Sequence, residues 1–113
     1  MASLEDEITE LYSEPGVGAS IINTYGEENI RNLLQMYRSL TDPDLGNMLE
    51  LVRRYSQSGD LNTCYISVAV LHALGEKDDV VAAYAWAETQ DDPKIFTQHF
   101  DIGVSLAEYL DWS

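Results

Sequence analysis

The side chains of this sequence that could do chemistry are mostly carboxylates. Among 113 residues, 20 are Asp or Glu and only 6 are Lys or Arg, so the formal net charge is −14. Paired carboxylates can act as general acid and base, but here they are so frequent that their spacing has little specificity. Asp42-Pro43-Asp44 and Asp78-Asp79 are too short for an EF-hand loop, which needs alternating ligands that end in Glu. The more specific prediction is electrostatic, because such a field repels nucleic acid and anionic membranes and attracts cationic proteins.

The other reactive residue types lack the spacing that catalysis or metal binding requires. His72 lies in an apolar stretch that is typical of a core histidine, and His99 has no partner at metal-ligand spacing. Cys64, the single cysteine, lies near the same apolar stretch, and we predict a small buried side chain there. Gly16-Val17-Gly18 has neither the preceding strand nor the following Lys of a phosphate-binding loop, and no serine stands in a Gly-x-Ser-x-Gly motif. We therefore expect no enzymatic activity, no metal and no cofactor.

The segment from Ile66 to Trp86, ISVAVLHALGEKDDVVAAYAW, predicts two helices joined by a tight turn. Its first part is apolar nearly all round, as in a helix that is buried on several sides. Gly75 can end that helix in the left-handed conformation, and Asp79 can cap the next one. The second helix is rich in alanine, which lets two helices approach closely.

The rest of the chain also has the pattern of helices. Ser3 with Asp6 forms an acceptable capping pair, and Asp42-Pro43 and Asp92-Pro93 place Asp at a cap and Pro at a first helical position. Asp101 can cap a last helix. We predict a single all-α domain over 1–113, with an N-terminal helical cap at 1–26 and about three antiparallel helical hairpins at 27–112. The hairpins would form either a short α-solenoid or a compact helical bundle.

Residues 59–92, about a third of the chain, resemble one Sel-one-like repeat, a relative of the tetratricopeptide repeat. Val68-Ala69 stands at the family's Leu-Gly pair and Gly75 at its terminal glycine. Asp79, Ala83 and Trp86 match the Asp-x-x-x-Ala-x-x-Trp pattern of the second helix. The loop is about three residues shorter than usual, and the alanine pair expected after the tryptophan is absent. The resemblance implies a stack of helical hairpins that presents a surface to another protein.

If the hairpins stack, the turns inside each pair fall on one edge of the molecule. That edge would hold six carboxylates, opposed only by Lys77, and we predict that it binds the partner: Asp42, Asp44, Glu76, Asp78, Asp79 and Asp101. The alternative is local, because an Asp at a helix N-cap contributes about 1 kcal/mol to helix stability without any partner. Asp42, Asp79 and Asp101 are all plausible caps, so both interpretations stay open.

Charge and cysteine content also limit the compartment and the partner. No segment reaches the ~18 apolar residues of a transmembrane helix, and the acidic N-terminus lacks the pattern of a signal peptide. With a lone cysteine, this predicts a protein of the reducing cytoplasm. We expect a cationic protein partner, no direct binding to nucleic acid or membrane, and a monomer rather than a homo-oligomer.

In size and acidity the chain resembles small acidic toxin-immunity proteins. This resemblance implies binding to a cationic toxin domain, most often a nuclease, whose active site is blocked. A second hypothesis is a phage-type inhibitor or DNA mimic, of the anti-restriction or anti-CRISPR kind, which exploits the same field. A third is a small helical-repeat adaptor whose groove holds a peptide.

Overall fold

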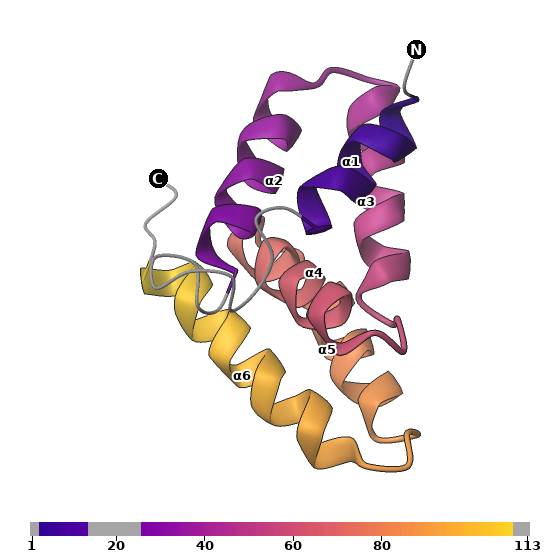
Figure 1. The fold of residues 1–113 in the computed structure, drawn as a ribbon, viewed down its shortest axis with the longest axis vertical. Coiled ribbons are helices and arrows are strands. Elements are labelled where there is room, and N and C mark those ends of the chain that lie inside the picture. The colour runs from indigo at the N-terminus through magenta and orange to yellow at the C-terminus, as the bar shows by residue number, and fades with distance from the viewer. Residues whose placement is uncertain (1–2, 14–25, 110–113) are drawn as a thin grey trace.

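In the computed structural model, residues 3–13 and 26–109 are described, and they form six helices and no strand. The all-α prediction is confirmed. The remaining residues of the predicted N-terminal cap and the last four residues of the chain lie outside the described ones. The helices, shown in Figure 1, are α1 (Leu4–Ser13), α2 (Glu27–Ser39), α3 (Asp44–Tyr55), α4 (Leu61–Ala73), α5 (Lys77–Ala87) and α6 (Pro93–Tyr109).

Helix α4 is the centre of the molecule. All eight residues from Cys64 to Leu71 are buried, as the continuous apolar pattern predicts, because α4 packs against α2, α3, α5 and α6. Asp60 caps this helix, since its Oδ2 accepts from the Thr63 backbone N–H at 3.1 Å. With extents of 38 × 31 × 29 Å, the chain is a compact helical bundle rather than an elongated solenoid.

Helix α1 is held on α2 and α3 by its C-terminal end. The Asn29 side chain of α2 is fully buried, and its Nδ2 donates to the carbonyl oxygens of Leu11 at 2.9 Å and Tyr12 at 3.3 Å. These carbonyls belong to the last turn of α1, where the C=O groups have no N–H donor within the helix. The Tyr12 hydroxyl also lies 2.6 Å from Ser67 Oγ of α4. Figure 1 shows α1 lying across α2 and α3, which make their main contacts with α1 and α4.

Two helix boundaries agree with the sequence pattern. Gly75 has a φ of 79° and ends the α4 segment in the left-handed conformation, as predicted. Ser3 Oγ accepts from the Asp6 backbone N–H at 3.2 Å, and Asp6 Oδ2 accepts from the Ser3 N–H at 3.4 Å. This is the reciprocal cap expected at the start of α1. In both cases the determinant is local.

Three predicted aspartate caps are wrong. Helix α3 begins at Asp44 with Pro43 in the cap position, so Asp42 precedes the cap. Helix α5 is preceded by Glu76 in the cap position, and Asp79 lies inside its first turn. Asp101 lies within α6, which is one continuous helix where a further helical pair is predicted. Helix capping therefore does not account for any of these three aspartates.

Helix α6 stays continuous because it lies along α4 at close range. A Cβ added at Gly103 would lie 3.0 Å from the Tyr65 carbonyl oxygen and 3.4 Å from Ala69 Cβ. Ala107 is buried one turn further on. Small residues at this crossing let the two backbones approach, and no proline follows Pro93 within α6. The predicted hairpin between α4 and α5 forms, and α5 also packs on α6.

Candidate partner-binding surface

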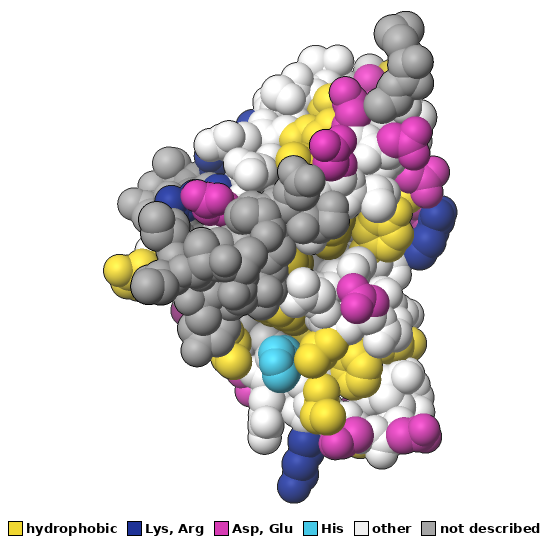
Figure 2. All heavy atoms as spheres, viewed as in Figure 1, with side chains coloured by type: hydrophobic (Ala, Val, Ile, Leu, Met, Phe, Trp, Pro, Cys, Tyr) yellow, Lys and Arg dark blue, Asp and Glu magenta, His cyan; other side chains and the backbone are white. Residues whose placement is uncertain are grey.

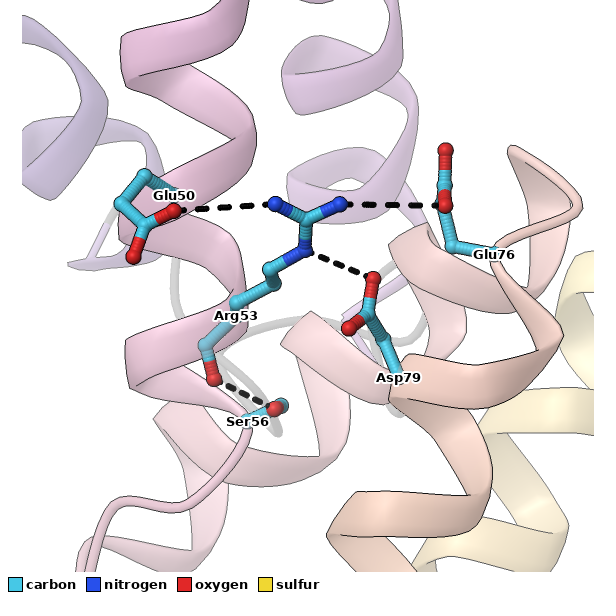
Figure 3. A network of polar contacts seen from close by, with 5 residues as sticks. All are labelled: Glu50, Arg53, Ser56, Glu76 and Asp79. Carbon is cyan, nitrogen blue, oxygen red and sulfur yellow. Dashed lines mark hydrogen bonds and ion pairs between the residues drawn. The ribbon is translucent and has the colours of Figure 1, made fainter.

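Arg53, in the last turn of α3, lies among three carboxylates (Figure 3). Its Nε donates to Asp79 Oδ2 at 2.8 Å, and Nη2 lies 3.9 Å from Glu76 Oε2. The third carboxylate is Glu50, one turn earlier on α3, whose Oε2 lies 3.6 Å from Nη1. These contacts join α3 to the start of α5. They hold the carboxylates of Glu76, which precedes α5, and of Asp79, which lies in its first turn.

The charge of this cluster is not balanced. Three carboxylates and one guanidinium leave a formal charge of −2. The hydrogen bond that Arg53 donates to Asp79 raises the pKa of Arg53, so the guanidinium stays charged. The Arg53 side chain is 40% exposed, and ion pairs at that exposure contribute at most about 1 kcal/mol each. The cluster therefore orients carboxylates more than it stabilises the fold.

A second acidic feature lies beside the first, between the start of α1 and α3. An open hollow of about 370 Å³ is lined there by Ser3, Leu4, Glu5, Asp44, Asn47, Glu50, Leu51 and Arg54. Glu50 belongs to this hollow and to the Arg53 cluster, so the two features are continuous. We call the combined region the acidic surface and define it by five residues: Glu5, Asp44, Glu50, Glu76 and Asp79. Figure 2 shows acidic side chains gathered over the α1 side of the molecule, with few basic ones among them.

Three of the six predicted binding residues belong to the acidic surface, namely Asp44, Glu76 and Asp79. Asp42, in the turn before α3, and Asp78, in the first turn of α5, are exposed close to these residues in sequence. Asp44 and Arg53 are nine residues apart, which is about 14 Å along the axis of α3 and half a turn around it, so the acidic surface winds around α3 from its start to its last turn.

Asp101 is held apart from the others. It lies on α6, where its Oδ1 accepts a hydrogen bond from the Tyr84 hydroxyl of α5 at 2.6 Å. Burial of Tyr84 and this bond to an anion raise the pKa of the phenol above its ordinary value. The bond ties α5 to α6.

Sequence reasoning missed Glu5, Glu50 and Arg53. The expectation that only Lys77 opposes the acidic edge is wrong, because Arg53 contacts both Glu76 and Asp79. Glu50 and Arg53 are three residues apart on one helix, a spacing that could have indicated their pair. Arg53 and Asp79 are 26 positions apart, and no local pattern indicates that contact.

The histidines and the cysteine have ordinary structural partners. His72 Nε2 lies 3.2 Å from Glu108 Oε1, and His99 Nδ1 donates to the Ile95 carbonyl oxygen at 2.7 Å. Cys64 is buried, as predicted, and its Sγ donates to the Ser56 carbonyl oxygen at 3.0 Å. Burial raises the pKa of the Cys64 thiol to about 12, which leaves little thiolate at neutral pH. Within residues 3–13 and 26–109, no three His, Cys, Asp or Glu side chains form a group that could hold a metal ion.

Comparisons of the chain with protein-family models, with curated proteins and with solved structures find no match. The resemblance of residues 59–92 to a Sel-one-like repeat therefore stays a prediction. No helix in the described part of the chain is both long and apolar enough to span a membrane.

Proposed function

We propose that this protein is a small acidic inhibitor that binds a cationic protein domain. The specific form of the proposal is an immunity protein that neutralises a nuclease toxin by covering its active site. The observation that supports it best is the acidic surface along α3, in a chain whose formal net charge is −14. A nuclease cleft carries basic side chains that bind phosphates, and carboxylates complement the same side chains.

Electrostatics would act first on the rate of encounter. Complementary charge raises association rates about 10- to 1000-fold at low salt, and salt screens this effect. The Arg53 cluster would act on the affinity, because Glu76 and Asp79 are already oriented before the partner arrives. Ordering a long side chain at an interface costs about 0.5–1.5 kcal/mol, and carboxylates that are held in place avoid part of that cost.

The test is a pull-down with the purified protein as bait, eluted with a rising salt gradient and followed by mass identification of the partner. We expect a single basic nuclease domain, bound one to one, released by salt and inactive in the complex. The control bait is Asp78→Lys with Asp44→Lys, which reverses two exposed charges and should retain much less of the partner. Recovery of a multi-subunit nucleic-acid-binding complex would instead favour the DNA mimic. Partners that are neutral and insensitive to salt would favour the adaptor and overturn the proposal.

A further inference from the structure

Helix α6 has a second row of apolar side chains that does not face the core. Ile95 is 45% exposed, Ile102 is 37% exposed and Tyr109 is 83% exposed. They are spaced by seven residues, which places them in one line along an α-helix, about 120° from the buried Phe100, Gly103 and Ala107. The line is about 21 Å long, at 1.5 Å per residue. Such an apolar line supplies one of the two core positions that each heptad of a coiled-coil seam requires.

The seam also has a hollow of the shape that a helix can fill. An open hollow of about 560 Å³ is lined, among the described residues, by Asp101, Ile102, Ser105, Leu106 and Tyr109. Four of these, Ile102, Ser105, Leu106 and Tyr109, have the i, i+3, i+4, i+7 spacing of the hole that receives one side chain of a facing helix. Ser105 is the smallest of the four, and its short side chain leaves the centre of the hole open.

The charges beside the seam indicate what kind of helix fits. Asp101 and Glu108 immediately precede Ile102 and Tyr109, in the flanking positions where coiled coils carry interhelical ion pairs. Both side chains are exposed, although Asp101 also accepts the Tyr84 hydroxyl and Glu108 lies 3.2 Å from His72 Nε2. The residue in the equivalent position before Ile95 is the basic Lys94, at the start of α6. A second copy of the protein would bring acidic flanks together with a formal charge of −14 on each chain, which opposes pairing.

We propose that the apolar seam of α6 docks a basic amphipathic helix of the partner. A leucine-sized side chain of that helix would enter the hole around Ser105, and its lysines or arginines would lie beside Asp101 and Glu108. This inference rests on the proposed function for the identity of the partner, because the acidic surface would steer the cationic domain and the seam would anchor it. The physical claim about the seam can be tested without that partner.

The test uses a synthetic 18-residue peptide of leucine and lysine, with leucines spaced for one apolar face of a helix, and a scrambled peptide of the same composition. Binding to the whole protein is measured by fluorescence anisotropy, and the contacted residues are mapped by amide chemical shifts. We expect Ile95→Gln with Ile102→Gln to weaken binding at least about tenfold, the factor that ~1.4 kcal/mol of lost contact corresponds to. The matched control is Val81→Gln, which removes a 66% exposed apolar side chain from α5 and should leave binding unchanged.

Three results would overturn the inference. The scrambled peptide could bind as well as the amphipathic one, the double variant could bind like the wild type, or shifts could fall on the acidic surface and not on α6. A fourth result, a concentration-dependent dimer that the double variant loses in analytical ultracentrifugation, would also overturn it, because the seam would then bind a second copy. Thermal unfolding of both variants checks that they remain folded. Failure of the proposed function is distinguishable, because it is decided by the pull-down and would leave seam-dependent peptide binding intact.

Discussion

At the scale of single residues, neighbouring carboxylates have different roles. Asp78 is exposed and has no role in the Arg53 cluster, whereas Asp79 accepts the shortest contact of that cluster, at 2.8 Å. Their positions in the sequence could not separate them, since both stand in the first turn of α5. The difference comes from Arg53, which approaches from α3. A carboxylate can therefore be assigned a role in attracting a partner only after its ion pairs within the protein are known.

The first prediction compares these two aspartates. Asp79→Asn should lower the free energy of unfolding by up to about 1 kcal/mol, because it removes a partly exposed ion pair. Asp78→Asn should change stability by no more than about 0.5 kcal/mol, as is usual for an exposed side chain without special contacts. Urea unfolding at low salt measures both, and high salt should reduce the difference between them. Equal destabilisation by the two variants would show that the Arg53 contact contributes nothing.

The second prediction concerns the Cys64 thiol at alkaline pH. Burial, followed by the charge of Asp60, raises its pKa from 9.0 to about 12. The unfolded chain then loses this proton first as the pH rises, so the thiol's contribution to stability is complete below about pH 9 and is lost between about pH 9 and 12. The slope reaches about 1.4 kcal/mol per pH unit for one such group.

Urea unfolding at several pH values, for the wild type and Cys64→Ala, measures this contribution. The variant should be less stable near neutral pH because of the cavity, and it should lose less stability than the wild type above pH 9. Tyr12 and Tyr84, whose pKa values burial also raises, are present in both proteins and cancel in the comparison. If the two stability curves run parallel above pH 9, burial does not raise the pKa of the Cys64 thiol.

At the scale of helices, the sequence predicts what is decided locally. The continuous apolar pattern of α4, the left-handed Gly75 and the pairing of Ser3 with Asp6 all depend on residues within one or two turns, and the structure confirms them. Asp101 shows where this reasoning stops. An aspartate favours a cap when its neighbours are considered alone, but here its carboxylate is bound by Tyr84 from another helix. The continuity of α6 depends on its contact with α4, which lies far away in sequence.

The third prediction tests that contact through two helical glycines. Gly46→Ala should stabilise the protein by about 0.5–1 kcal/mol, because nothing lies within 4 Å of the added Cβ and alanine is the better helix former. Gly103→Ala gains the same propensity, but its Cβ would meet the Tyr65 backbone at 3.0 Å. Overpacking of this kind costs about 1–3 kcal/mol, so the variant should be less stable than the wild type.

Thermal and urea unfolding measure the change in the free energy of unfolding, which should be positive for Gly46→Ala and negative for Gly103→Ala. Gly46→Ala serves as the matched control, since it makes the same chemical change in a helix with open space around it. If both variants are stabilised equally, α4 and α6 can move apart without cost, and the small residues at their crossing do not determine the fold.

At the scale of the whole molecule, composition predicts the charge but not its distribution. The excess of 20 acidic over 6 basic residues is evident from the sequence, and the cationic partner that we propose is a hypothesis from that excess. The hollow that brings Glu5 of α1 beside Asp44 and Glu50 of α3 requires the packed bundle. Half of the predicted edge, Asp44, Glu76 and Asp79, belongs to that surface because each flanks a turn that ends near α3. The prediction put Asp101 on the same edge because it assumed a stack of hairpins with a turn at that residue. In the structure Asp101 lies within α6 and has no turn beside it.

The last prediction follows from the net charge, and it gives salt two opposite effects. In the free protein, 14 uncompensated negative charges repel one another, and this repulsion is stronger in the folded state because the charges are closer together. Raising the ionic strength from about 0.01 M to 1 M shortens the Debye length from about 30 Å to 3 Å, so the melting temperature should rise. Association with a cationic partner should slow over the same range, by about tenfold or more, because the attraction is screened as well. Differential scanning calorimetry of the free protein and stopped-flow association at matched salt concentrations measure the two effects. If salt changes neither the melting temperature nor the association rate, the basic residues already balance the negative charges near them. The net charge would then contribute only to solubility.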